Sequence, residues 1–184
     1  MNDVNNLELG PTENFFGTAG GELTLGFTSG GTTINVEDDR TDLVADQLGT
    51  SPADQAITGR GATVEMELAE TTLENLLIVL PGARLVVDSG DPTKKKLVLR
   101  NPVGTQMVKD GFAKSLLIKK FVGGAASSDP QDFIRFFLAA PTGALSLPFN
   151  VADQRTYAVT FQCFPDTSNS DRALGVFGDE SAAS

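Results

Sequence analysis

The sequence predicts a mainly β fold, a β-sandwich or barrel of about eight strands with one short flanking α-helix. Short stretches of alternating apolar and polar residues recur along the chain, separated by glycine, proline and serine. Only residues 72–80 carry a helical pattern of leucines, and Pro81-Gly82 ends it. The 184 residues suffice for one domain with a real core, and we assign that domain to residues 22–164.

The first part of the chain is expected to form an arm followed by a hairpin. Residues 1–21 are polar and rich in glycine, so we expect an arm that becomes ordered on assembly. Residues 22–27 and 32–37 alternate as two strands, and Ser29-Gly30-Gly31 between them is typical of a turn. Residues 38–57 are acidic and rich in turn formers, which predicts a long exposed loop, a kind of segment that is often functional.

The clearest strand covers residues 62–69. Its even-numbered residues from 62 to 68 are apolar, whereas Thr63, Glu65 and Glu67 are polar, so one face is expected in the core and the other in solvent. Thr71 and Glu74 have the spacing of a capping box, which predicts that the helix begins there.

Strands dominate the rest of the domain, and the chain ends in a polar tail. The expected strands are residues 84–88, 96–100, 113–122, 133–139 and 155–164. In the last of these, Tyr157, Val159, Phe161 and Cys163 share one face. Residues 165–184 are small, polar and acidic, and we expect them to be flexible or to dock on a neighbouring subunit.

Composition excludes many kinds of catalytic site. The chain has no His and a single Cys, so it has no Ser-His-Asp triad, Cys-His dyad or His-ligated zinc. Glu65 and Glu67 are neighbouring carboxylates, but such a pair is more typical of a solvated strand face than of a glycosidase. The acidic run from Glu37 to Asp46 lacks the spacing of an EF-hand. We interpret the chain as a non-enzyme with no metal and no cofactor.

No stretch is long and apolar enough to span a membrane, and the polar first ten residues do not resemble a signal peptide. Synthesis in a cytoplasm is therefore expected, without membrane partners.

Charge is distributed unevenly along the chain. Residues 1–80 hold 14 acidic and 2 basic side chains, whereas residues 81–184 hold 10 acidic and 12 basic ones. Complementary charge of this kind can join copies of one chain. The candidate basic subunit-contact residues are Lys94, Lys95, Lys96, Lys119 and Lys120.

Residues 22–82 resemble the tail tube proteins of long-tailed bacteriophages. The resemblance lies in a strand with a glycine-rich turn (LGFTSGGTTINVEDD), an acidic stretch (TDLVADQLGTSPAD), a strand with an acidic face (ATVEMELAET) and a short helix closed by Pro-Gly (TLENLLIVLPG). The late strand RTYAVTFQCFPD is similar to the closing strand of these proteins. Together these motifs cover about half of the chain.

The resemblance implies a virion protein made in the host cytoplasm. Such proteins form hexameric rings that stack into a hollow tube, contact other tail proteins and let DNA pass through the lumen without tight binding. The side chains expected in an acidic lumen are Thr33, Asn35, Glu37, Thr63, Glu65 and Glu67. The resemblance also implies that the loop 38–57 contacts the next ring, through Asp38, Asp39, Asp42, Asp46, Gly49, Pro52 and Asp54.

Two other classes remain open. One is a single-ring virion component, such as a tail terminator, a neck protein or a baseplate ring. The other is a ligand-binding β-sandwich, for which the absence of Trp and the single Tyr are unfavourable.

Overall fold

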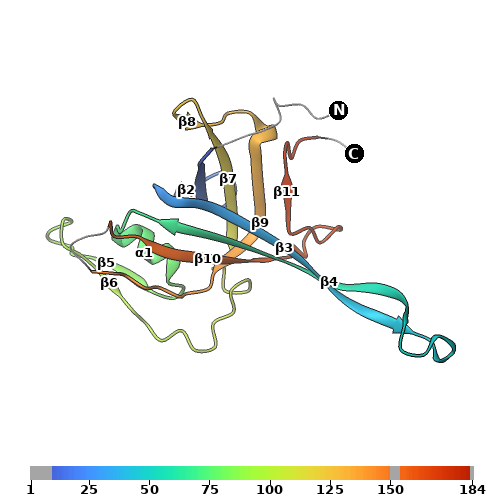
Figure 1. Cartoon of the computed structure of the whole chain (residues 1–184). Helices are drawn as coiled ribbons and strands as arrows, with labels where there is room; N and C mark the ends of the chain where they lie inside the picture. Colours follow the sequence, from blue (N-terminus) through green and yellow to red (C-terminus); the bar gives the residue numbers. More distant parts are fainter. Residues whose placement is uncertain (1–9, 150–153, 183–184) are drawn as a thin grey trace.

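The computed structural model describes residues 10–149 and 154–182 and shows a mainly β chain, as the sequence predicts (Figure 1). Within these residues there are eleven strands, one α-helix and two short 3-10 helices. In chain order the elements are β1 (Thr12–Gly17), β2 (Leu23–Thr24), β3 (Thr28–Val44), η2 (Asp46–Leu48), β4 (Pro52–Leu68), α1 (Leu73–Val79), β5 (Arg84–Val87), β6 (Lys95–Val98), β7 (Lys114–Val122), β8 (Ala125–Ala126), η3 (Pro130–Asp132), β9 (Phe133–Pro141), β10 (Tyr157–Phe164) and β11 (Gly175–Phe177). The strands beyond the expected eight are β1, β8 and β11, of which β8 and β11 are only two and three residues long and too short to leave an alternating pattern.

One antiparallel sheet forms the body of the molecule, in the order β2-β1-β7-β9-β10-β4-β3. β8 pairs with β7, β11 pairs with β9, and β5 and β6 form a separate two-stranded sheet. The sheet folds over on itself, so that β3, β4 and β10 cross β1, β7 and β9 (Figure 1). The two layers also meet through β1 and β3, where the buried Asn14 amide donates a hydrogen bond of 2.9 Å to the Thr32 hydroxyl.

The core lies between the two layers, and the period of the sequence correctly predicts its main strands. In β4 the apolar side chains from Ala62 to Leu68 are buried, and in β10 the alternate residues from Tyr157 to Cys163 are buried. Phe16 of β1 packs on Phe161 of β10 with ring centroids 5.1 Å apart. These contacts join the first and last long strands of the sheet.

The helix α1 has its predicted place, but its N-cap is Thr72 and not Thr71. The Thr72 hydroxyl accepts a hydrogen bond of 3.1 Å from the backbone N–H of Asn75. The Asn75 amide in turn donates to the carbonyl of Leu25, at 3.2 Å. The buried residues of α1 are Asn75 and Val79, whereas its leucines and the C-cap Leu80 are half-buried, although leucines at this spacing predict a buried helix face. In the described part of the chain no helix could cross a bilayer.

The prediction that residues 22–27 and 32–37 form a hairpin is wrong. Gly30 and Gly31 do not end a strand but lie within β3, where the pairing with β4 skips from Ser29 to Thr32. Both glycines have positive φ values, 78° and 87°, which lets the strand bulge without ending. Before it, only Leu23 and Thr24 are strand, and they pair with β1.

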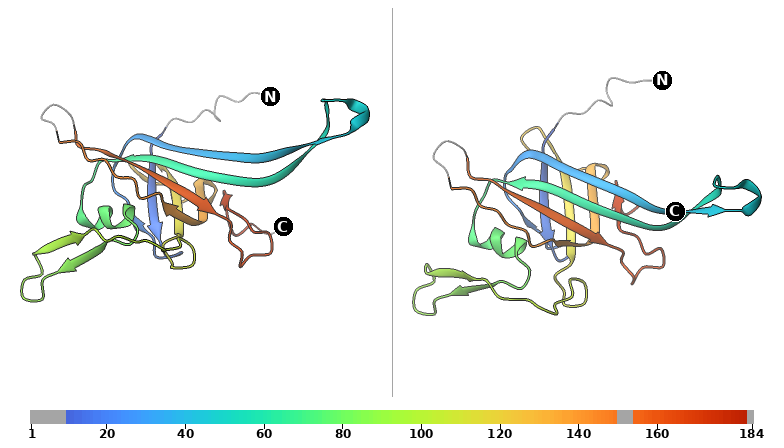
Figure 2. Two further views of the ribbon diagram at one scale, coloured as in Figure 1. Left: turned by 90° about the horizontal axis from the view of Figure 1, so that it is seen from below. Right: turned by 60° about the horizontal axis from the view of Figure 1, so that its bottom comes forward.

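The predicted loop 38–57 is also wrong as secondary structure. It is the outer half of a hairpin, because β3 stays paired with β4 as far as Val44 and Pro52. The turn is confined to residues 45–51, with Gly49 at a φ of 63°. The hairpin projects well beyond the body of the molecule (Figures 1 and 2). We call residues 38–57 the arm.

Both ends of the chain contribute strands to the sheet. Residues 12–17, expected in an N-terminal arm, form β1 and pair with β7. Within the C-terminal tail, β11 pairs with β9. Residues 1–9, 150–153 and 183–184 lie outside the described part of the chain.

Candidate functional site: a polar sheet face and a projecting arm

The residues expected in a lumen lie together on one face of the sheet. Pairing of β3 with β4 sets Thr33 opposite Glu65 and Asn35 opposite Thr63. Opposite residues of an antiparallel pair have their Cβ atoms about 5 Å apart, so these side chains are neighbours. We call the six side chains the polar face: Thr33, Asn35, Glu37, Thr63, Glu65 and Glu67. All of them are exposed except Thr63, which is half-buried.

The polar face continues onto β10 and is acidic. Thr160 lies opposite Glu65, and Gln162 lies opposite Thr63. Asn35, Glu37, Asp39, Glu65 and Gln162 line a shallow depression on this face. The charged side chains of the polar face are all carboxylates.

The basic residues of these strands, Arg40 and Arg60, are both bound to Asp38. Arg60 donates to the two Asp38 oxygens, from Nε at 2.5 Å and from Nη2 at 3.0 Å. Arg40 Nη2 lies 3.7 Å from Oδ2 of the same carboxylate. The Arg60 hydrogen bond, and then the charges of Arg60 and Arg40, lower the pKa of Asp38. Because side chains alternate along a strand, Asp38 and Glu37 point to opposite sides, which leaves the polar face without a cation.

The arm combines acidic and exposed apolar side chains. Asp42 lies on β3, Asp46 begins η2, and Asp54 lies on β4. Among them Leu43, Val44, Leu48 and Ile57 are exposed, Val44 to 67%. The carboxylates of the arm were predicted from the sequence, whereas these four exposed hydrophobic residues were not. Their signal in the sequence is that apolar residues recur within an acidic segment. A loop that faces only solvent does not need such residues.

The expectation that the five lysines form one basic surface is wrong, because they lie in two separate places. Lys94, Lys95 and Lys96 lie on or next to β6, whereas Lys119 and Lys120 lie near the end of β7 beside β8, on the other side of the body (Figure 1). The fold separates them because β6 belongs to the two-stranded sheet with β5, whereas β7 lies in the main sheet between β1 and β9.

Several of these lysines already contact groups of the same chain. Lys95 Nζ lies 2.6 Å from Glu74 Oε1, and this contact lowers the pKa of Glu74. Lys120 Nζ lies 2.8 Å from Asp132 Oδ1. Lys119 Nζ lies 4.5 Å from the ring centroid of Phe133. These contacts lie within a single copy of the chain. Only part of the positive charge of the five lysines can therefore contact another subunit.

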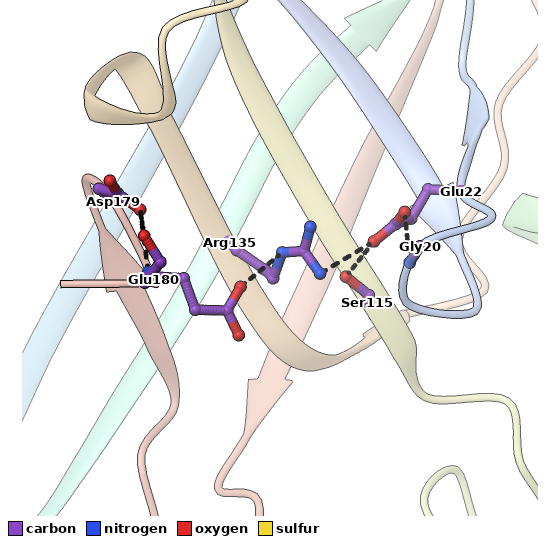
Figure 3. A network of polar contacts seen from close by, with 7 residues as sticks. Gly20, Glu22, Ser115, Arg135, Asp179 and Glu180 are labelled. Atoms are coloured by element: carbon purple, nitrogen blue, oxygen red, sulfur yellow. Dashed lines mark hydrogen bonds and ion pairs between the residues drawn. The ribbon is translucent and has the colours of Figure 1, made fainter. Parts of the chain in front are cut away.

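A polar network that the sequence did not indicate holds the C-terminal segment (Figure 3). Arg135 of β9 lies between Glu22, at 3.5 Å from Nη1, and Glu180, at 3.4 Å from Nε. The Ser115 hydroxyl donates to Glu22 at 2.8 Å. Burial alone would raise the pKa of Glu22, but the bonds from Ser115 and backbone N–H groups and the charge of Arg135 outweigh it and lower that pKa. The network ties residues far apart in sequence to one surface of the sheet.

The described residues offer little for covalent or metal chemistry. No group of three or more His, Cys, Asp or Glu side chains among them is placed to hold a metal ion. Cys163 is buried in the core, and burial raises the pKa of its thiol to about 12.

No family model and no curated relative matches the chain. Among solved structures, the chain is similar to one from the virion of the native gene transfer agent particle, with a TM-score of 0.39 and 9% identity, over 81% of this chain and 88% of that chain. It is also similar to a chain of the SPP1 tail tube, with a TM-score of 0.41 and 10% identity, over 83% of this chain and 72% of that chain.

Proposed function

We propose that the chain is a structural virion protein that forms stacked hexameric rings of a phage tail tube, with the polar face lining a lumen for DNA. The observation that carries the proposal is the polar face itself. Its six residues were expected in a lumen from the sequence, and the fold gathers them on one exposed face whose charges are all negative.

An acidic lumen suits DNA that must slide. Duplex DNA is densely charged, and each Lys or Arg contact with a phosphate adds salt-dependent affinity that would hold it in place. The polar face offers carboxylates, hydroxyls and amides, and the two arginines of its strands are bound to Asp38 on the other side. Phosphates passing this face would be repelled at short range.

Open strand edges support closure of a ring. β3 ends the main path of the sheet, so one edge of its 17 residues has no strand partner within the described chain. A long exposed edge normally invites pairing with another chain. In the proposed ring, pairing between neighbouring subunits would cover such edges and join six polar faces around one channel.

The arm would contact the next ring, and exposed surfaces elsewhere would contact other tail proteins. The arm projects out of the body and buries none of its side chains in the single copy. A projecting element without a core of its own gains stability when a partner covers it. The proposed location is the virion tail, after synthesis in the host cytoplasm.

Negative-stain electron microscopy of the purified chain, at low and high concentration, tests the proposal. We expect six-fold rings that stack into hollow tubes as concentration rises. Rings that never stack would indicate a single-ring virion component. Uniform monomers at both concentrations would contradict the tube and favour a ligand-binding β-sandwich.

A further inference from the structure

We propose that the tip of the arm of one copy docks in an apolar groove next to α1 of another copy. The inference rests on the proposed function and specifies the surface that receives the arm. We call residues 41–57 the arm tip. The receiving groove is lined by Leu80, Leu99, Arg100, Pro102, Met107 and Phe164, among others.

The arm tip presents apolar surface that nothing in the single copy covers. Leu43 and Val44 on β3 and Leu48 in η2 lie at or next to the turn and are exposed, Val44 to 67%. Ile57 on β4 pairs with Arg40, nearer the base of the arm, and is 59% exposed. Exposed apolar residues that gather at the end of one element mark an interaction surface, because their burial removes apolar area from water.

The receiving groove offers apolar surface of matching kind. It encloses about 510 Å³ between the end of α1, the segment that follows β6 and the ends of β9 and β10. Leu99 in its wall is 71% exposed, and Val103 in the same segment is 86% exposed. Both side chains add exposed apolar area beside the groove, and contiguous apolar area of this kind is typical of an interaction surface.

Charge favours the pairing of these two surfaces. The arm tip carries Asp42, Asp46 and Asp54 and no basic residue. Residues 99–107, which form one wall of the groove, carry Arg100 and no acidic residue, and Lys96 and Lys109 flank this segment. Arg100 itself lines the groove. Opposite potentials of this kind steer two surfaces together and fix their register.

A second depression, next to the base of the arm, fits the tip less well. It is lined by Ile57 and Arg60, which belong to β4 itself, and by Asp171 and Arg172, whose charges cancel. The groove near α1 is lined by Arg100 and by no carboxylate, which suits an acidic tip.

The arm tip and the receiving groove lie at opposite ends of the molecule, so the proposed contact is head-to-tail. The arm tip lies at one end of the molecule, whereas α1 and the β5–β6 hairpin lie towards the other (Figures 1 and 2). A contact between two different surfaces does not close on itself in a pair, so it can repeat from copy to copy along a stack. At about 3.3 Å per residue, the part of β3 within the arm extends roughly 20 Å, enough to reach another subunit.

Site-specific cross-linking between two full-length variants tests the contact. One chain carries Leu48→Cys and the other Val103→Cys, and a short bismaleimide joins thiols that lie close together. The native Cys163 is buried and gives the background in the unsubstituted chain. The matched control replaces Val103→Cys by Thr167→Cys, an exposed position outside the groove. We expect about tenfold more cross-linked pair than in the control, because docking holds the two thiols at a high effective concentration.

Charge reversal supplies a second readout that does not depend on cysteine chemistry. One chain carries Asp42→Lys, Asp46→Lys and Asp54→Lys, and the other carries Arg100→Glu and Lys109→Glu. We expect neither chain to stack alone, because like charges then meet at each contact. A mixture of the two should stack, because each reversed arm tip finds a groove of opposite charge.

The outcomes separate this inference from the proposed function. Rings or tubes that form without cross-linking above the control, and charge variants that stack alone, would overturn the docking site and leave the tube standing. A chain that forms no rings, no tubes and no cross-linked pair would contradict both.

Discussion

At the scale of single residues, the side chain of Glu22 is central to a polar network outside the hydrophobic core. Its side chain is only 6% exposed, and it accepts from Ser115 while facing Arg135 (Figure 3). The carboxylate therefore satisfies a hydroxyl and a guanidinium that would otherwise lose a partner. Glu180, the second partner of Arg135, is 53% exposed and far less constrained.

Substituting Glu22→Gln should lower the free energy of unfolding by about 1–3 kcal/mol, because Arg135 loses its buried charge partner. The matched variant Glu180→Gln should cost less than about 1 kcal/mol, as is usual for exposed pairs. Urea denaturation at pH 7 measures both. Because the folded pKa of Glu22 lies below its ordinary value of 4.5, the difference between wild type and Glu22→Gln should shrink as the pH falls through that folded pKa. Equal losses for the two variants would contradict the assigned roles.

Two buried acids make the fold sensitive to high pH. Burial raises the pKa of the Cys163 thiol to about 12, and burial together with the charge of Glu70 raises that of Tyr157 to about 12. Unfolded, the same groups would lose their protons near their ordinary values of 9.0 and 10.0. Their contribution to stability is thus complete below pH 9 and is lost as the pH rises towards about 12.

We therefore expect the free energy of unfolding to fall steadily above pH 9, and the thiol to resist alkylation at pH 8 until the chain unfolds. The double variant Cys163→Ala and Tyr157→Phe should show a shallower fall, which assigns the effect to these two groups. Urea denaturation from pH 8 to pH 11 and the rate of thiol labelling provide the measurements. Rapid labelling of the native chain would show that Cys163 is not held in the core.

The cap of α1 gives a test at the scale of one element. Two threonines precede the helix, and only the Thr72 hydroxyl bonds to the Asn75 N–H. Replacing Thr72→Ala should lower the free energy of unfolding by about 1 kcal/mol, the usual effect of losing an N-cap. Thr71→Ala is the matched control and should change stability by no more than a few tenths of a kcal/mol. A larger effect at Thr71 in thermal denaturation would restore the capping box that the sequence pattern suggested.

The arm is expected to matter for assembly and not for folding. Residues 42–55 can be replaced by Asn-Gly, since Thr41 and Ala56 are paired across the hairpin and a two-residue turn fits such a pair. The midpoint of thermal unfolding should stay within about 4 °C of wild type, because no side chain in the removed part is buried. Stacking of rings should be lost in electron micrographs. Tubes that form at the normal rate, in this variant or after deletion of residues 49–54 alone, would exclude the arm from the contact between rings.

At the scale of the whole molecule, the polar face can be tested by reversing its charge. In Glu65→Lys with Glu67→Lys, assembled particles should bind duplex DNA, with an affinity that falls about tenfold or more between ~50 and ~200 mM salt. A control with Asp110→Lys and Asp171→Lys has the same net charge, changed at exposed residues outside the polar face. Fluorescence anisotropy of labelled DNA measures both. Equal binding by the two variants would show that net charge, and not the polar face, governs contact with DNA.

The fold class and the buried faces of the long strands follow from the sequence, because burial on one side imposes a period of two. This pattern correctly identifies the core sides of β4 and β10 and places the polar face on the opposite side of β4. It also locates α1, whose leucines and closing Pro81-Gly82 are local signals. By contrast, the arm was mistaken for a loop because both of its sides are solvated, so no alternation marks it as strand.

What the sequence by itself determined is thus which stretches are strands with a buried side, where the helix lies and which residues can face water. Only the tertiary structure decided that β3 and β4 continue into the arm, that β1 and β11 join the sheet, and that the five lysines are divided between two surfaces. The physical reason is that burial of one strand face leaves an alternation of apolar and polar residues in the sequence. Exposed or very short strands pair through backbone N–H and C=O groups, which nearly all residues have, so their pairing leaves no such pattern. Which strands pair, and hence which distant side chains meet, is settled by the packing of the whole sheet.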